Sequence, residues 1–142
     1  MIYKKSWKYI LIRDNSWWIT HGDGYYRLKA IKNFGDVRRG NIGGYVKSYH
    51  SLSQKGKCWI YNEARVRDRA LVIDNARVFN QSFITDDAVI SDNAQTYGDS
   101  WIRDNARVSG NAKVFGKSRI SNDTLIYGRQ CIYDNRLVIG DI

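Results

Sequence analysis

The sequence has few cysteines and histidines, and it lacks any long apolar run. The 142 residues include two cysteines, Cys58 and Cys131, and two histidines, His21 and His50. Two cysteines cannot make a disulfide framework, which fits a reducing, cytosolic environment. Two histidines leave few options for a metal site or a general base. No apolar stretch approaches the ~18–20 residues of a membrane-spanning helix, and the N-terminal one ends at Arg13, too early for a typical signal peptide.

The composition is otherwise that of one folded domain. Hydrophobic residues make up 43% of the chain and charged residues 26%, which argues against bulk disorder. Residues 1–57 hold 12 lysines and arginines against three acids, whereas residues 58–142 hold 11 of each sign. The whole net charge of +9 therefore lies in the first part of the chain. We infer two modules with different roles, residues 1–57 and residues 58–142.

A six-residue repeat runs through the second module. A small residue recurs every six positions and an aliphatic residue stands two places after it, as in Ala64–Val66, Ala70–Val72 and Ala76–Val78. A helix cannot use a strict six-residue period, because six residues do not return to the same face of a 3.6-residue turn. Short β-branched strands fit, since the Asp, Asn and Gly between them accept left-handed backbone angles. The repeat therefore predicts a β-solenoid.

These units resemble the hexapeptide repeats of left-handed parallel β-helix proteins, in which three units make one triangular coil. The resemblance covers residues 58–142 and implies a left-handed parallel β-helix of about five coils. The stretch YRLKAIKNFGDVRRGNIGGYVKSYHSLSQKGKCWIYNEARV, residues 26–66, resembles the lead-in of a group of short β-helix proteins common in bacteriophages and mobile elements. Most members of that group have no assigned function. The resemblance thus implies a phage-type origin and, with the few cysteines, the cytoplasm of a bacterial host.

The first 57 residues do not follow the repeat. The stretches WKYILIR (7–13), SWWIT (16–20) and YYRLKAI (25–31) predict three short strands, so we expect an all-β chain with a small N-terminal β-meander. Aromatic residues interleaved with cations are typical of nucleic-acid-binding surfaces, although aromatics also cap solenoid ends. We expect both: apolar side chains cap the first coil and the cations face outward. The candidate residues for binding nucleic acid or another acidic partner are Lys4, Lys5, Lys8, Arg13, Trp17, Trp18, Arg27, Lys29, Lys32, Arg38 and Arg39.

One outward position of the repeat is aromatic in every coil. Its members recur every 18 residues, so strand spacing would place them about 4.8 Å apart in a continuous aromatic ladder. An exposed aromatic stripe usually marks a covered surface. We expect the N-terminal module or a second subunit to cover it in a homo-oligomer, with a ligand site as the alternative. The ladder consists of Tyr61, Phe79, Tyr97, Phe115 and Tyr133.

A second outward surface alternates arginine with aromatic residues. Such a surface can hold phosphates and stack bases, and it is also typical of wet protein interfaces. Corner acids at Asp68, Asp86 and Asp104 lie at its turns and are placed to offset the arginines. The members of this surface are Arg65, Arg67, Phe83, Trp101, Arg103 and Arg119.

The residues suggest no catalytic set, metal site or cofactor. Many β-helix proteins are trimeric acyltransferases with a histidine base, but this repeat contains no histidine, and His50 in the lead-in is the one candidate. The glycines between Phe34 and Lys57 match neither a P-loop nor a dinucleotide fingerprint. We expect them to serve the transition into the first coil.

These observations together predict a non-enzymatic binding protein. We expect it to bind an acidic partner, either nucleic acid or a host defence protein that handles nucleic acid, and to act as a stoichiometric inhibitor. A hexapeptide-repeat acyltransferase-like enzyme and a purely structural oligomeric scaffold remain the alternatives. No membrane partner is expected.

Overall fold

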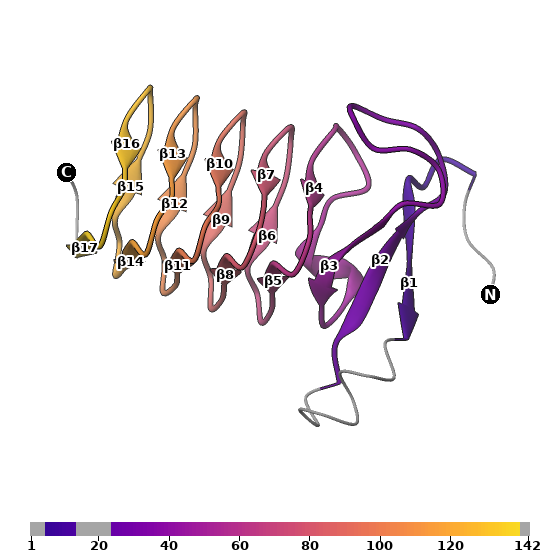
Figure 1. The fold of residues 1–142 in the computed structure, drawn as a ribbon, viewed down its shortest axis with the longest axis horizontal. Coiled ribbons are helices and arrows are strands. Elements are labelled where there is room, and N and C mark those ends of the chain that lie inside the picture. The colour runs from indigo at the N-terminus through magenta and orange to yellow at the C-terminus, as the bar shows by residue number, and fades with distance from the viewer. Residues whose placement is uncertain (1–4, 14–23, 140–142) are drawn as a thin grey trace.

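The computed structural model describes residues 5–13 and 24–139, which form short β-strands and one 3₁₀ turn (Figure 1). The N-terminal elements are β1 (Tyr9–Arg13), β2 (Tyr26–Ala30), β3 (Ile42–Val46) and η1 (Tyr49–Ser51). The strands that follow are β4 (Trp59–Ile60), β5 (Arg65–Val66), β6 (Leu71–Val72), β7 (Arg77–Val78), β8 (Phe83–Ile84), β9 (Val89–Ile90), β10 (Gln95–Thr96), β11 (Trp101–Ile102), β12 (Arg107–Val108), β13 (Lys113–Val114), β14 (Arg119–Ser121), β15 (Leu125–Ile126), β16 (Cys131–Ile132) and β17 (Leu137–Ile139). The described residues contain no helix long and apolar enough to cross a membrane.

The strands stack into three sheets, one on each side of the coil. The five-stranded sheet has the order β16-β13-β10-β7-β4, and the four-stranded sheet has the order β15-β12-β9-β6. The long sheet contains β5, β8, β11, β14 and β17 and is extended by β3, β2 and β1 to eight strands. Within the repeat each strand pairs in parallel with the strand 18 residues later, as at Trp101↔Arg119. This confirms the predicted parallel β-solenoid of about five turns, whose coils stack along the long axis in Figure 1.

The inward positions of the repeat build one continuous core. The recurring small and aliphatic residues are completely or almost completely buried from Ala64 to Ile132, and the hydrophobic cluster runs from Tyr9 to Val138. The core of the N-terminal strands is therefore joined to that of the solenoid. Burying such side chains contributes on the order of 1.5–3 kcal/mol for each large aliphatic residue.

The corners of the coil use left-handed backbone angles. Asp74 and Asp92, for example, have φ of 59° and 55°, a region that Asp, Asn and Gly tolerate best. Their carboxylates also stabilise the stack, because Oδ2 of each accepts a hydrogen bond from the backbone N–H 18 residues later, at 3.0 Å for Asp74 and 2.8 Å for Asp92. The corner residues with positive φ are Asn62, Asp68, Asp74, Asn80, Asp86, Asp92, Gly98, Asp104, Gly110, Gly116, Asn122, Gly128 and Asp134.

Parallel stacking begins before the hexapeptide pattern does. Strand β3 pairs in parallel with β5, with Tyr45 opposite Arg65, and Leu52 forms a parallel bridge to Val72. Both pairs are 20 residues apart, whereas β4 and β7 are 18 apart. The first coil is therefore two residues longer than the others, and the surplus lies in the loop at residues 53–57.

The glycines of the lead-in allow close packing of the backbone. An added Cβ would lie 2.6 Å from the Ile60 carbonyl oxygen at Gly43 and 2.5 Å from the Ala64 carbonyl oxygen at Gly44. No larger residue fits at either position without a shift of the neighbouring coil. Gly43 and Gly44 therefore serve the transition into the first coil, as expected. That both lie within strand β3 was not predicted.

The N-terminal strands form an antiparallel meander, β1-β2-β3, at one end of the solenoid (Figure 1). The predicted strands at 7–13 and 25–31 correspond to β1 and β2. The predicted strand at 16–20 lies outside the described residues, and the third described strand of the meander is β3.

The outer edge of β1 is covered by two side chains. The Gln54 amide accepts from the backbone N–H groups of Lys8 and Tyr9, at 2.8 and 3.3 Å, and donates to the Tyr9 carbonyl at 3.1 Å. The Tyr49 hydroxyl accepts from the Leu11 N–H at 3.1 Å. These contacts substitute for a neighbouring strand and protect an edge that would otherwise pair with other chains.

Candidate functional site

The outward side of the long sheet joins the two modules into one surface. The strand pairing places Arg27 opposite Tyr45 and Tyr45 opposite Arg65, and the column continues coil by coil to Leu137. Neighbouring members lie about 4.8 Å apart, so Arg27 and Arg119 are about 24 Å apart along the sheet. We call this surface the arginine–aromatic face. It comprises Arg27, Lys29, Tyr45, Lys47, Arg65, Arg67, Phe83, Trp101, Arg103 and Arg119.

Guanidinium groups lie over the aromatic rings of this face. The Cζ atom of Arg27 is 4.4 Å from the ring centroid of Tyr45, and Arg65 lies 4.5 Å from Phe83. Phe83 and Trp101 meet edge to face at 5.8 Å. Such contacts hold the cations in fixed positions and contribute about 0.5–1 kcal/mol each at exposed sites. Because guanidiniums already occupy ring faces, the surface is arranged for contact with anions more than for base stacking.

Arg119 is held in place by several contacts. Its Cζ lies 4.6 Å from the Trp101 ring, and its Nη1 donates to the backbone carbonyls of Asp99, Lys117 and Ser118 at 2.7, 3.0 and 3.1 Å. In the described part of the chain its Nε and Nη2 have no hydrogen-bond partner. These donors remain available for a ligand.

A small pocket lies beside this arginine. Its volume is about 200 Å³, and it is lined by Trp101, Arg103, Arg119, Ile120, Ser121 and Leu137. Trp101 is 43% exposed and Leu137 65% exposed, so the pocket combines two cations with apolar walls.

The corner acids leave most of the face positive. Arg67 lies 3.5 Å from Asp68, whose carboxylate accepts a hydrogen bond from the Thr85 hydroxyl at 2.6 Å. That hydrogen bond, with help from Arg67, holds the pKa of Asp68 below its usual value. Asp86 and Asp104 each accept a backbone N–H from the next coil. Of the three predicted acids, only Asp68 forms an ion pair with an arginine of this face among the described residues.

Part of the predicted N-terminal set adjoins this face. Lys29 is two residues from Arg27 in strand β2 and so lies on the same side of the sheet. With Arg39 it lines a hollow of about 450 Å³ beside β1. Lys47 lies 4.6 Å from the ring centroid of Tyr25. Lys47 was not among the predicted residues; it follows Tyr45 by two residues, directly after the end of β3, and so lies on this face.

Lys8 does not belong to the outer surface and is a correction to the prediction. It is 2% exposed, and its ammonium donates to the Cys58 carbonyl at 2.7 Å, the Gly56 carbonyl at 3.2 Å and the Cys58 thiol at 3.2 Å. It also lies 4.9 Å from the centroid of the Phe34 ring. Burial lowers the pKa of Lys8, while Cys58 acts in the opposite direction. Lys8 therefore binds the two modules together.

The other predicted cations are spread over the N-terminal module. Lys5, Arg13 and Arg38 are exposed, and the Lys32 ammonium donates to the Ser6 carbonyl at 3.0 Å. The guanidinium of Arg38 donates to carbonyls of its own loop. Lys4, Trp17 and Trp18 lie outside the described residues.

The aromatic ladder forms as a continuous stack on the five-stranded sheet. Its neighbouring ring centroids are 4.4, 6.3, 4.8 and 5.7 Å apart, and the second contact is edge to face. The N-terminal module reaches its first member, because the Tyr61 hydroxyl donates to Asp36 at 2.7 Å. Burial and this hydrogen bond raise the pKa of Tyr61. Tyr133 at the far end is 46% exposed, so the described part of the module does not cover the whole ladder.

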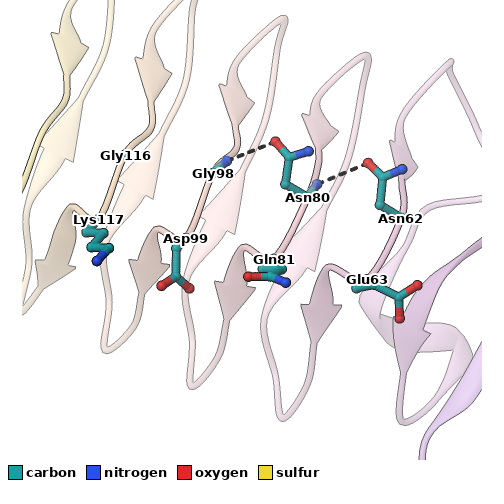
Figure 2. A pocket seen from close by; sticks show the side chains of 8 residues that line it. All are labelled: Asn62, Glu63, Asn80, Gln81, Gly98, Asp99, Gly116 and Lys117. Atoms are coloured by element: carbon teal, nitrogen blue, oxygen red, sulfur yellow. Dashed lines mark hydrogen bonds between the residues drawn. The ribbon is translucent and has the colours of Figure 1, made fainter.

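A groove of about 610 Å³ runs along the corner between the aromatic ladder and the arginine–aromatic face. Figure 2 shows Glu63, Gln81, Asp99 and Lys117 projecting from successive turns, with the Asn62 and Asn80 side chains bonded to the next coil. Along this row Glu63 and Asp99 are acidic, Gln81 is neutral and Lys117 is basic. The groove therefore favours no single ligand class.

Among the described residues, no three histidine, cysteine or carboxylate side chains are grouped as a metal site. His50 is exposed, and its Nε2 lies 3.2 Å from the Arg69 carbonyl oxygen. Cys58 is buried and Cys131 exposed, and both are free thiols.

No protein-family model matches the chain, and a search of curated proteins finds no match.

Proposed function

We propose that the protein is a non-enzymatic binding protein whose arginine–aromatic face holds the phosphate backbone of a nucleic acid. The supporting observation is the column of guanidiniums that are fixed over aromatic rings along one continuous sheet. Guanidiniums form strong, charge-assisted hydrogen bonds with phosphate, and pre-positioning them reduces the entropy lost on binding. Binding through the backbone is independent of base sequence.

The test is fluorescence anisotropy with labelled single-stranded DNA, duplex DNA and RNA across a salt series. We expect affinity to fall steeply with salt, because bound cations displace counterions from the nucleic acid. Arg103→Glu should weaken binding and lower the salt slope by about 0.7–0.9 for one lost phosphate contact. Arg107→Glu is the matched control, since Arg107 is exposed on the four-stranded sheet and carries the same charge. Absence of binding at low salt, or equal effects of the two variants, would refute the proposal.

An acidic protein surface is the second candidate partner. The observation that favours it is the apolar exposure of Trp101 and Leu137 beside Arg103 and Arg119, which resembles the anchor and charged surround of a protein interface. Binding of this kind would depend on Trp101 and show a weaker salt dependence. A pull-down from host lysate with wild-type protein and Trp101→Ser would identify such a partner.

The resemblance to short β-helix proteins of phages and mobile elements supports a place for this protein in the cytoplasm of a bacterial host. A stoichiometric inhibitor of a nucleic-acid-handling defence protein fits either mode of binding. Self-association through the aromatic ladder is compatible with both, because the ladder lies on a different sheet from the arginine–aromatic face.

A further inference from the structure

A second positive surface lies on the far side of the solenoid from the arginine–aromatic face. It follows the corner between the four-stranded and five-stranded sheets, and in a three-sided coil this corner lies opposite the long sheet. Its cations and amides recur at 18-residue intervals in two columns; the column of Arg77, Gln95 and Lys113 is bounded by Trp59 and Cys131, and the corner beside the strip carries Asp74 and Asp92. We call it the amide–cation strip; it comprises Lys57, Asn75, Arg77, Asn93, Gln95, Asn111, Lys113 and Arg129.

The strip contains a hollow that is lined by hydrogen-bond donors. The hollow has a volume of about 330 Å³ and is lined by Lys57, Asn75, Arg77, Asn93 and Gln95. The Asn75 Oδ1 accepts from the Lys57 backbone N–H at 3.1 Å, so the NH₂ of this amide is left to donate outward. An ammonium, a guanidinium and amide NH₂ groups are the donors that an oxyanion such as phosphate requires.

The cations of the strip are not neutralised by the protein. In the described ranges, the side chains of Lys57, Arg77, Lys113 and Arg129 form no hydrogen bond or ion pair. The nearest acids along the corner are Asp74 and Asp92, and one oxygen of each carboxylate accepts a backbone N–H from the next coil. No strip position itself carries a carboxylate.

The dimensions suit an extended anion. Lys57 and Arg129 are four strand spacings apart, about 19 Å, and Arg77 and Lys113 are two spacings apart, about 10 Å. Amides lie between the cations in both columns. A linear polyanion can therefore contact several cations of the strip in turn.

We propose that the amide–cation strip is a second nucleic-acid-binding surface and that one molecule bridges two nucleic-acid segments. This inference rests on the proposed function of the arginine–aromatic face, which holds the first segment. The two surfaces lie on opposite sides of the coil, so neither ligand blocks the other. When several protein molecules bind the same two strands, each bridge raises the effective concentration of the strands for the next one.

The experiment uses the full chain and two non-complementary single-stranded DNA oligonucleotides, one biotinylated and one fluorescent. Capture on streptavidin beads should recover fluorescence only when the protein is present. Lys113→Glu should reduce the recovered fluorescence about tenfold, as expected for one lost charge-assisted contact, while an anisotropy titration with one oligonucleotide loses the second binding event and retains the first, at the arginine–aromatic face. Arg107→Glu is the matched control: both residues are exposed and open a two-residue strand, and this variant should bridge like the wild type.

The outcomes separate the two proposals. Loss of anisotropy binding in the wild type overturns the proposed function, whereas intact single binding without fluorescence recovery overturns only the bridging inference. Bridging that survives both Lys113→Glu and the milder Arg77→Gln also overturns the inference. Such bridging would come from self-association of the protein and not from the strip. Light scattering verifies that the mass of each variant matches that of the wild type, and far-UV circular dichroism verifies its fold.

Discussion

Substitutions of Asp92 can separate two contributions to the stability of a solenoid corner, the side-chain hydrogen bond and the left-handed backbone angle. Asp92 has φ of 55°, and its Oδ2 accepts the Gly110 N–H at 2.8 Å. Asp92→Asn keeps both the acceptor and the tolerance for left-handed angles. Asp92→Gly keeps only the backbone freedom, and Asp92→Ala keeps neither. The series therefore separates the side-chain hydrogen bond from backbone strain.

The expected losses follow from these two contributions. A hydrogen bond of this kind contributes about 1 kcal/mol. An alanine held at left-handed backbone angles costs about 1–2 kcal/mol more. Glycine avoids the strain but adds roughly 0.4–1 kcal/mol through the flexibility of the unfolded chain. Asp92→Asn should thus change the free energy of unfolding by less than about 0.5 kcal/mol, Asp92→Gly by about 1.5–2 and Asp92→Ala by about 2–3 kcal/mol.

Urea denaturation followed by far-UV circular dichroism and tryptophan fluorescence measures these differences. Two probes are needed because coils contact only their neighbours and can unfold in parts. Asn93→Ala is the control, since Asn93 is exposed at the next position and has no positive φ, and it should change stability by less than about 0.5 kcal/mol. If Asp92→Ala costs no more than Asp92→Gly, backbone strain is irrelevant. If Asp92→Asn costs as much as Asp92→Ala, the hydrogen-bond explanation is wrong.

Three further predictions concern the ladder, the sheet edge and the corner acids. Tyr97→Asp should lower the oligomeric mass or change solubility, because it places a charge in the middle of the aromatic ladder; an unchanged mass in light scattering counts against an interface there. Gln54→Leu should cost about 1–3 kcal/mol for each buried group left unpaired at β1, including the Tyr9 carbonyl, with aggregation visible by light scattering. The Thr85 hydroxyl lowers the folded-state pKa of Asp68, so this carboxylate contributes stability above its unfolded pKa of about 3.9 and loses it as pH falls through the lower folded value. Carboxyl NMR titration of Thr85→Val should show the pKa of Asp68 rising, and an unchanged value would contradict this assignment.

The solenoid was predictable because its constraints are local and repeat. A strand of two residues alternates inward and outward side chains, so the six-residue period alone determines which residues enter the core. The 18-residue pairing then follows from three strands per coil, and the aromatic ladder with it. The first coil escaped prediction because its two extra residues, in the loop at 53–57 between β3 and β4, interrupt the six-residue period. Extrapolating the repeat backwards from Cys58 therefore misses the alignment of Tyr45 with Arg65.

The candidate site was predictable in its columns but not in its contacts. The repeat places Arg65, Phe83 and Trp101 in one column, yet side-chain rotamers decide which ring a guanidinium covers. Arg27 joins this column because β2 pairs antiparallel with β3. The six-residue repeat does not extend to these strands and so could not predict this pairing. Lys8 was assigned to the surface because its charge suggested exposure. Its burial depends on carbonyl oxygens contributed about 50 residues later, at the end of the first coil.

The cations of the solenoid are spaced so that they repel one another little, and their effect on binding can therefore be tested apart from stability. Within the repeat, no outward column places two cations on neighbouring coils: Thr85 separates Arg67 from Arg103, and Gln95 separates Arg77 from Lys113. Alternation keeps such charges about 10 Å apart, near the screening length at physiological salt, so their repulsion is small.

Removing one of these charges should therefore leave stability unchanged while weakening the proposed binding. We expect Arg103→Gln to change the free energy of unfolding by less than about 0.5 kcal/mol, because Arg103 is exposed and makes no hydrogen bond or ion pair among the described residues. Its affinity for single-stranded DNA at low salt should fall severalfold in anisotropy measurements, as one phosphate contact is lost. A large loss of stability would show that Arg103 serves the fold, and the positive columns would then need no ligand to explain them.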